Sequence, residues 1–139
     1  MTYRIEHNPN PDPSDVERLR ASLSRYNRSK IPDRGYLPVH LTLLDERNGL
    51  AGGLSGYVAY GWLFVDTLWI AETARSRGFG RELMQQAEEI ARTHGAHYAW
   101  LDTFSFQARG FYEKLGYRVF AELEDFPPGH SRYFLRKEL

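Results

Sequence analysis

The chain has 139 residues, of which 42% are hydrophobic and 14% aromatic, which is enough for one packed core and too few for two ordinary domains. We therefore expect a single domain over residues 1–139. Lysine plus arginine and aspartate plus glutamate both number 18, so no net charge attracts nucleic acid or an anionic membrane. The absence of cysteine excludes a disulfide framework, a thiolate zinc site and a thioester formed on the enzyme.

The first residues of the chain, 1–15, contain neither the basic segment nor the apolar run of a signal peptide. No apolar stretch is long enough to span a bilayer. These features predict a cytoplasmic protein.

The amino-terminal third begins with residues 2–7, whose alternation predicts a short edge strand before a segment with three prolines. Either Asp12, which precedes a proline, or Ser14 caps the helix that follows. One apolar face of this helix consists of Val16, Leu19, Leu23 and Tyr26. Residues 27–38 contain two prolines and a glycine, which predicts a loop or one helical turn over a binding cleft.

Strand patterns dominate from Val39 onwards. Residues 39–46 predict a strand, Asn48-Gly49 is a two-residue hairpin signal, and the glycines of residues 50–61 indicate a bent or bulged returning strand. Residues 62–71 are apolar on both faces except at Asp66 and Thr67, which predicts a central strand covered on both sides. A carboxylate in such a strand needs a specific reason.

The next segment, residues 72–96, predicts a helix that starts close to Gly78 and stops at Gly95. Its core-facing residues are predicted to be Leu83, Ala87, Ile90, Ala91 and His94.

A second apolar strand, a short helix and two closing strands complete the predicted order. The strand covers residues 97–104, and the helix covers residues 106–116, with Ser105 as its cap. Residues 117–126 and 131–139 predict a pair of strands around a Pro-Pro-Gly-His turn. This order predicts a mixed α/β domain.

The most informative segment is the run Arg-Ser-Arg-Gly-Phe-Gly-Arg at residues 75–81, between a buried strand and a long helix. Glycine lets the backbone approach a ligand closely, and the unpaired amides at a helix N-terminus attract an anion such as a pyrophosphate. No Gly-Lys-Ser/Thr follows, so this is not a Walker loop, and the dinucleotide fingerprint lacks its third glycine. A turn that needs glycine only for its geometry is the alternative.

Two motifs in this order resemble those of the GNAT N-acetyltransferases. The pattern Arg75-x-x-Gly78-x-Gly80 resembles the cofactor signature of that superfamily. The second motif resembles the next element of that family, in which an alanine, a tyrosine and a Gly-aromatic pair recur at the same spacing. Its residues here are Ala108, Tyr112, Gly116 and Tyr117. The resemblance covers Val39 to the C-terminus and, more loosely, the first helix. Residues 103–117 and 127–137 further resemble a bacterial subgroup of small GNAT proteins whose substrates are mostly unassigned. It implies a mixed, mostly antiparallel central sheet that is splayed and flanked by helices.

The resemblance also implies acetyl-coenzyme A as co-substrate and no metal. The loop amides and the side chain of Arg75 or Arg81 would hold the pyrophosphate, and the backbone of residues 68–70 would pair with the pantetheine and polarise the acetyl carbonyl. Ser105 stands where the family often has an asparagine. The predicted cofactor contacts are Leu68, Trp69, Ile70, Arg75, Ser76, Arg77, Gly78, Phe79, Gly80, Arg81 and Ser105.

Tyr112 resembles the family tyrosine that protonates the leaving thiolate, and its phenol, with a pKa of ~10, lies close enough to a thiol at ~8.5 for easy transfer. An ordinary core tyrosine is the alternative. The attacking amine needs a base, for which Asp66 and Glu72 are the candidates and Asp102 and His130 are weaker ones. Strict alternation places Asp66 and Glu72 on one face, unless a bulge between them breaks the parity.

We therefore expect an acyl-coenzyme A-dependent N-acyltransferase that moves an acetyl group directly to a primary amine of a small molecule or peptide. A longer acyl donor and a non-catalytic acyl-coenzyme A sensor or interaction module are the alternatives. The expected partners are acetyl-coenzyme A and the amine acceptor, without nucleic acid or membrane, and the resemblance is compatible with a homodimer.

Overall fold

The computed structural model describes all 139 residues, which form two compact units, Met1–Arg34 and Gly35–Leu139. Helix α1 (Pro13–Lys30) belongs to the first unit, and all strands belong to the second. The single-domain expectation stays a prediction.

In the first unit, Asp12 is the residue that caps α1. Its carboxylate accepts a hydrogen bond from the amide of Ser14 at 2.9 Å, which also lowers the pKa of Asp12. The strand expected at residues 2–7 is wrong, because these residues have no neighbouring strand with which to form a ladder. The loop expected from Asn27 is also wrong at its start, since no proline interrupts the helix before Pro32 and the helix continues to Lys30.

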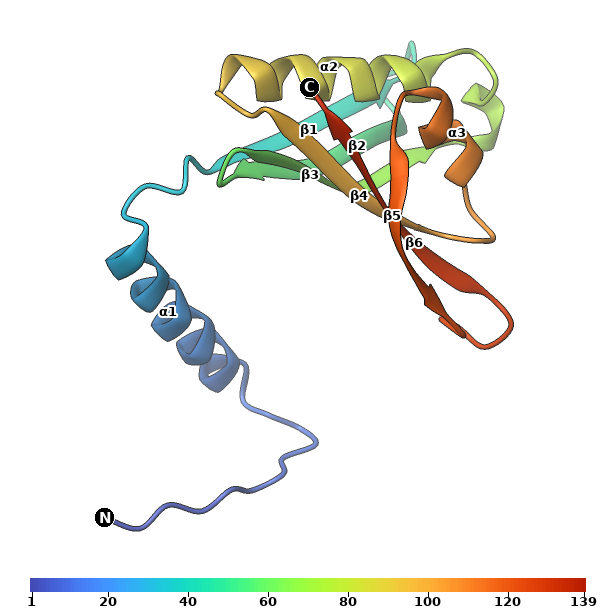
Figure 1. Ribbon diagram of the computed structural model, residues 1–139. Helices are drawn as coiled ribbons and strands as arrows, with labels where there is room; N and C mark the ends of the chain where they lie inside the picture. The colour runs from blue at the N-terminus through green and yellow to red at the C-terminus, as the bar shows by residue number, and fades with distance from the viewer. The chain divides into compact units, whose positions relative to one another are not determined.

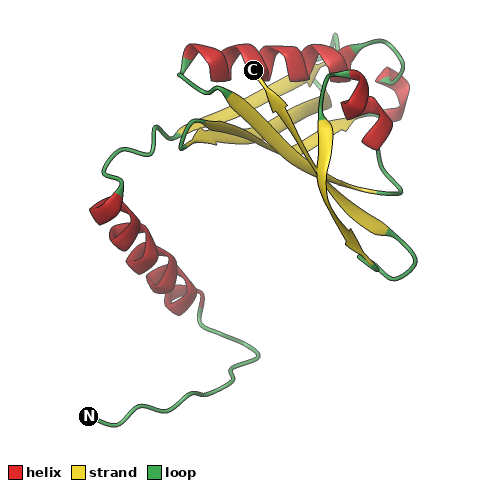
Figure 2. Ribbon diagram, viewed as in Figure 1, coloured by secondary structure: helices red, strands yellow, loops and turns green.

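The second unit is built on one six-stranded sheet with the order β1-β2-β3-β4-β6-β5 (Figures 1 and 2). Its strands are β1 (Leu37–Leu44), β2 (Leu50–Ala59), β3 (Trp62–Ile70), β4 (Tyr98–Phe104), β5 (Arg118–Glu124) and β6 (Ser131–Glu138). Its helices are the short 3₁₀ turn η1 (Glu72–Ala74), α2 (Phe79–Thr93) and α3 (Arg109–Lys114). Every neighbouring pair is antiparallel except β3 and β4, so the predicted mixed α/β class is confirmed.

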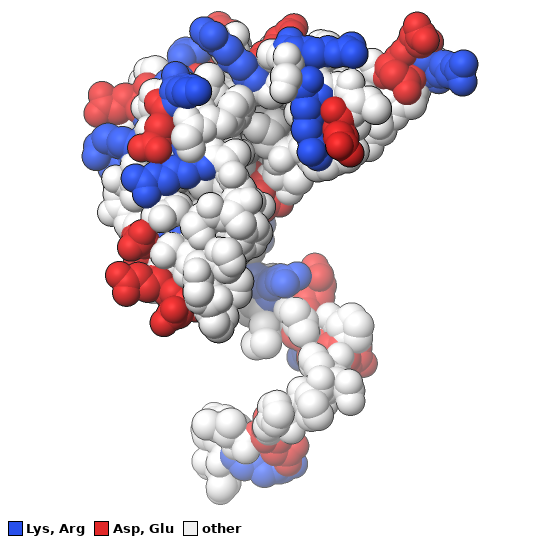
Figure 3. Space-filling model, turned by 90° about the vertical axis from the view of Figure 1, so that its right-hand side faces the viewer, with Lys and Arg blue, Asp and Glu red and all other residues white.

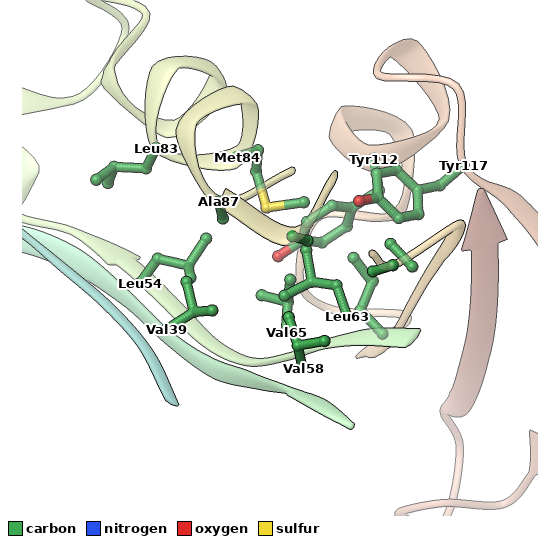
Figure 4. Packing of buried hydrophobic residues seen from close by; sticks show 14 of the residues in the cluster. Val39, Leu54, Val58, Leu63, Val65, Leu83, Met84, Ala87, Tyr112 and Tyr117 are labelled. Carbon is green, nitrogen blue, oxygen red and sulfur yellow. The ribbon is translucent and has the colours of Figure 1, made fainter. Parts of the chain in front are cut away.

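The core lies between α2 and one face of the sheet, where Figure 4 shows Leu83, Met84 and Ala87 of α2 above residues of β1, β2 and β3. Of the predicted face of α2, three residues are buried, Ile90 is half-buried and His94 is exposed. The helix stops as predicted at Gly95, whose φ of 82° suits glycine. Glu88 is also buried, which the apolar pattern did not indicate.

The turn between β1 and β2 is longer than the predicted two-residue hairpin. Residues 45–49 form it, and one carboxylate oxygen of Asp45 accepts hydrogen bonds from the amides of Arg47 and Gly49, each at 2.8 Å. Asn48 takes the left-handed conformation, with a φ of 62°. The side chain of Asp45 therefore stabilises a longer loop.

A β-bulge in β3 sits at Asp66. The register runs from Ser55↔Thr67 to Gly56↔Val65, which leaves Asp66 as the extra residue. Beyond this point β3 and β4 part, since their parallel pairing ends at Val65↔Leu101. The splayed sheet and the bulge are thus confirmed.

Only one face of β3 is fully buried, so the expectation of a strand covered on both sides is wrong for this unit. Leu63 is 0% exposed, whereas Trp69 is 50% exposed. Aromatic rings on this less buried face of the sheet stack on one another instead, as in the pair Phe64 and Trp100 at 4.3 Å between ring centroids. Such stacking shields apolar surface where no helix of this unit covers the sheet.

The expected cap of α3 at Ser105 is wrong, because the helix begins at Arg109 without a side-chain cap. A turn over residues 104–107 precedes it, in which the amide of Gln107 donates to the carbonyl of Phe104 at 2.9 Å. The predicted end of the helix at Gly116, with a φ of 96°, is confirmed.

Candidate functional site

A groove of about 990 Å³ opens in the second unit where β3 and β4 part. Its walls are formed by residues 66–70, 74–76, 78–81, 102–104, 106–108, 111 and 112. The groove therefore joins the split strands, the glycine loop and α3.

The β3 wall offers main-chain groups that have no strand partner. The amide of Ala71 donates to the carbonyl of Ala51 at 2.8 Å, so by antiparallel alternation the polar groups of Trp69 face β2 and those of Leu68 and Ile70 face the split. The carbonyl of Ile70 is occupied, because it accepts a hydrogen bond from Nε of Arg75 at 2.9 Å. The amide and carbonyl of Leu68 are left directed towards the groove.

The glycine loop presents open amides at the start of α2. No side chain caps this helix, and the amides of residues 77–81 donate to no atom of the protein. Gly78 has a φ of 85°, and a Cβ on Gly80 would lie 3.2 Å from the ring of Phe111. Unpaired amides and the helix dipole together make this end of the groove suitable for an anion such as a diphosphate.

Three arginines surround the loop. Arg75 and Arg81 line the groove, whereas Arg77 lines a neighbouring pocket beside residues 43–47. Two cationic side chains therefore reinforce the anion site from within the groove itself.

Tyr112 reaches the groove from α3. Its side chain is buried, at 8% exposure, and its hydroxyl makes no hydrogen bond within the protein. Burial and then the charge of Asp102 raise the pKa of Tyr112 to about 12. The phenol therefore stays protonated around neutral pH, but it is a weaker acid than the free side chain on which the sequence prediction relied.

The predicted base candidates lie in different places. Asp66 lines the groove at the bulge, and Glu72 starts η1 outside the lining residues. Asp102 lines the groove and is bound to Arg132. His130 is outside the lining, and its Nδ1 lies 3.2 Å from the hydroxyl of Ser105.

Ser105 is placed away from the groove lining, where its hydroxyl also accepts from the amide of Ser131 at 3.1 Å. A cofactor contact by Ser105 stays a prediction. The hydrogen bonds of its hydroxyl to His130 and Ser131 argue against that contact, because they already engage the hydroxyl. The sequence reasoning missed Gln107, which lines the groove and whose Oε1 accepts from the amide of Phe104 at 2.8 Å. Its position next to Ala108 of the second motif was the available signal.

Comparison with known proteins agrees with this geometry. Residues 2–117 match the model of the acetyltransferase (GNAT) family. The chain therefore belongs to the GNAT acetyltransferases, and the prediction of an acyl-coenzyme A-dependent N-acyltransferase is confirmed. None of its helices combines the length and the apolar character needed to cross a membrane.

Two relatives and two solved structures show the similarity of the chain to known acetyltransferases. The blasticidin-S acetyltransferase of Streptomyces morookaense is 41% identical over 120 residues, which span 85% of this chain and 88% of that protein. An acetyltransferase of Agrobacterium fabrum is 32% identical over 119 residues, spanning 86% and 87%. An acetyltransferase structure from Bacillus cereus has a TM-score of 0.85 at 34% identity and covers 96% of this chain and 98% of its own.

The fold also matches an aminoglycoside 6'-N-acetyltransferase solved with coenzyme A, with a TM-score of 0.65 at 17% identity over 73% of this chain and 72% of that one. At this identity the match shows the fold alone.

Proposed function

We propose that this protein transfers an acetyl group from acetyl-coenzyme A to a primary amine of a small molecule or peptide by direct attack. The observation that carries the proposal is the convergence of three features on one groove: open amides at the start of α2, unpaired main-chain groups of Leu68, and the hydroxyl of Tyr112. An anion site, a strand-like edge and a proton donor are what a bound thioester with a diphosphate requires.

The cofactor would lie along the groove from the loop to the fork of the strands. The amides of residues 77–81, with Arg75 and Arg81, would hold the diphosphate. The pantetheine would extend beside Leu68–Ile70 as an added strand, and the amide of Leu68 would polarise the acetyl carbonyl.

The chemistry then needs two proton transfers. The amine nitrogen attacks the thioester carbon, the carbon–sulfur bond breaks, and Tyr112 protonates the departing thiolate. A carboxylate takes the proton of the nitrogen. Of the two main predicted candidates, Asp66 lines the groove and Glu72 does not.

The acceptor is proposed to be a small molecule. A relative that is 41% identical bears the name blasticidin-S acetyltransferase, which makes blasticidin S the first acceptor to test. On the face drawn in Figure 3, groups of both charges are interspersed, in keeping with equal totals of 18, which supports the proposal that neither nucleic acid nor a membrane is a partner. We further propose a cytoplasmic location and no metal requirement, and a homodimer is compatible with the family.

The test is release of coenzyme A thiol by the purified chain from acetyl-coenzyme A, with blasticidin S and a panel of primary amines. We expect turnover with at least one amine, and much slower turnover at the same acetyl-coenzyme A concentration with the Gly80→Asp chain, whose proposed anion site carries a like charge. Propionyl- and succinyl-coenzyme A test the longer donors. Binding of coenzyme A without thiol release for any amine would overturn the proposal in favour of a sensor.

A further inference from the structure

The fork between β3 and β4 carries a carboxylate on each strand. The last paired residues are Val65 and Leu101, and the next residue on either strand is an aspartate, Asp66 on β3 and Asp102 on β4. Both line the groove. Two carboxylates therefore stand where the strands open.

The two carboxylates differ in how firmly they are held. Asp66 is exposed and takes part in no hydrogen bond or ion pair of its side chain. Asp102 is paired with Arg132, whose Nε and Nη2 lie 2.9 and 2.7 Å from the same oxygen, Oδ1. Its side chain is only 18% exposed, so the protein fixes its orientation.

Arg132 holds Asp102 through Oδ1, since the contacts of both its Nε and its Nη2 are with that oxygen. The side chain of Asp102 keeps 18% exposure and lines the groove. Its other oxygen, Oδ2, is therefore the acceptor that a ligand in the groove would use.

Arg132 is itself fixed by aromatic rings. Its guanidinium carbon lies 5.3 Å from the ring centroid of Phe104, 5.1 Å from that of Phe126 and 5.4 Å from that of Phe134. These rings come from β4, the turn before β6 and β6 itself. The side chain of Arg132, and with it the carboxylate of Asp102 that it contacts, is therefore held in place by contacts with three segments.

We propose that Asp102, positioned by Arg132, is the carboxylate that holds the acceptor nitrogen and takes its proton during acetyl transfer. This assignment rests on the proposed function and names a base other than Asp66 or Glu72. Asp102 and Tyr112 both line the groove, and after burial the charge of Asp102 is the second cause of the raised pKa of Tyr112, so a base and an acid could act on the same bound thioester.

The proton balance closes. The nitrogen of a neutral amine, hydrogen-bonded to Oδ2, forms a bond to the acetyl carbon while the carbon–sulfur bond breaks. The nitrogen loses one proton to Asp102, and the sulfur gains the proton of Tyr112. Water then carries the proton from the carboxylic acid of Asp102 to the phenolate of Tyr112, which restores both groups.

The test compares the full-length parent, Asp102→Asn and Asp66→Asn in the thiol-release assay with blasticidin S, or with the best amine of the panel if blasticidin S is not accepted. We expect Asp102→Asn to lower kcat by about a hundredfold or more, the usual contribution of a general base, with unchanged affinity for coenzyme A in calorimetry. Its rate should keep rising with pH where the parent levels off, because hydroxide replaces the missing base. The exposed carboxylate Glu122 of β5 gives a control, Glu122→Gln, which should match the parent.

Arg132 is a positioning residue, and its variants separate that role from a merely structural one. We expect Arg132→Gln to lower kcat less than Asp102→Asn does, and Arg132→Lys to recover part of the loss in a chain that keeps both charges. The double variant Asp102→Asn with Arg132→Gln should be no slower than Asp102→Asn alone, because both act through one group. Thermal unfolding verifies that each variant is folded, and Arg132→Lys serves as the test if Asp102→Asn is not.

Several outcomes would overturn the assignment. A folded Asp102→Asn with the kcat and pH profile of the parent would do so, as would a large loss confined to Asp66→Asn. Additive losses in the double variant would overturn the role of Arg132. A parent that acetylates no amine would overturn the proposed function itself, which distinguishes the two failures.

Discussion

Tyr112 combines near-complete burial with a hydroxyl that no protein group engages, which suits a residue that acts only when substrate is present. We predict that Tyr112→Phe lowers kcat by about a hundredfold, in the range of general acid catalysis, because the proposed role of the hydroxyl is to protonate the leaving thiolate. The affinity for coenzyme A in titration calorimetry should not change, since the bound ground state does not need the proton. Equal kcat values for variant and parent would remove the acid role.

The raised pKa of Tyr112 also predicts a stability effect at alkaline pH. The phenol has a pKa near ~10 in an unfolded chain and about 12 in the folded protein. The folded state therefore keeps a proton that the unfolded state loses, so this contribution is complete below about pH 10 and disappears as the pH rises towards 12. Two pKa units correspond to roughly 2–3 kcal/mol.

We accordingly expect the parent to lose more unfolding free energy than Tyr112→Phe does between about pH 8 and pH 11. Denaturant unfolding of both chains at these two pH values measures the difference. Tyr117, whose pKa is also raised by burial and by Glu88, is present in both chains and cancels in the comparison. A parent and variant that lose equal stability would show that burial does not hold the Tyr112 proton.

Sequence reasoning located the residues whose roles depend on local spacing. Arg75, Gly78 and Gly80 fall on a strand-to-helix turn that the sequence itself marks, and they lie at the groove. The ranking of the carboxylates was beyond its reach, because the arginine that contacts Asp102 comes from a distant part of the chain. Ser105 was misjudged as a cap for the same reason, since its partners lie in residues 130–131.

At the level of elements, the loop-to-helix junction at α2 gives a sharp test of the anion site. We predict that Gly80→Asp weakens binding of coenzyme A by about a hundredfold, because it places a carboxylate in the proposed diphosphate site, and juxtaposed like charges cost several kcal/mol. Gly80→Ala is the matched control: its Cβ would lie 3.2 Å from the ring of Phe111, so it carries the steric effect without the charge. Calorimetry measures both, and equal affinities for the two variants would count against a diphosphate at this turn.

The bulge of β3 depends on the absence of a side chain in β2. A Cβ on Gly56 would collide with the carbonyl oxygen of Phe64, which belongs to rigid backbone. We therefore predict that Gly56→Ala destabilises the fold by about 1–3 kcal/mol, as overpacking does. Gly110→Ala is the control, because a Cβ there meets nothing within 4 Å and alanine favours the helix α3.

Urea denaturation of both variants measures these effects. Gly110→Ala should be neutral or slightly more stable than the parent. Gly56→Ala should also bind coenzyme A less tightly, since the bulge directs the main chain of Leu68 towards the groove. A Gly56→Ala chain with parental stability would mean that the bulge tolerates a side chain.

Most elements were predictable because the period of their apolar residues agreed with the glycines and prolines at their ends. The apolar period of α2 and its terminal glycine gave a helix that the structure confirms, and the glycines of β2 gave a bulge. The misjudged elements lacked a local signal. Residues 2–7 alternate like a strand, yet a strand also needs a neighbour, and the length of the turn after β1 depends on the carboxylate of Asp45.

For the whole molecule, the sequence indicated a small mixed fold but not how its last strand is tied to the core. Every buried apolar residue lies in the unit Gly35–Leu139, as length and composition suggested for one core. The buried carboxylate of Glu88 escaped prediction, because it sits in an apolar helix face and its partners come from positions far along the chain. Tyr117 donates to its Oε2 and Lys137 to its Oε1, each at 2.8 Å.

These contacts join α2, the segment after α3 and β6, so they tie the C-terminal strand to the core helix. We predict that Lys137→Met destabilises the protein by about 3 kcal/mol, because it leaves the 4%-exposed carboxylate of Glu88 without its close cation. Arg92, at 3.9 Å from Glu88, offers only partial compensation.

The neighbouring Glu89, which is 72% exposed and pairs with Arg92, gives the matched control, and Glu89→Gln should change stability by less than about 0.5 kcal/mol. Urea unfolding measures both changes, provided that the m-value, the slope of the unfolding free energy against urea concentration, is the same for all chains. The double variant Glu88→Gln with Lys137→Met should recover part of the lost stability, because no charge is then left buried. Equal losses for Lys137→Met and Glu89→Gln would show that the buried pair does not hold the last strand.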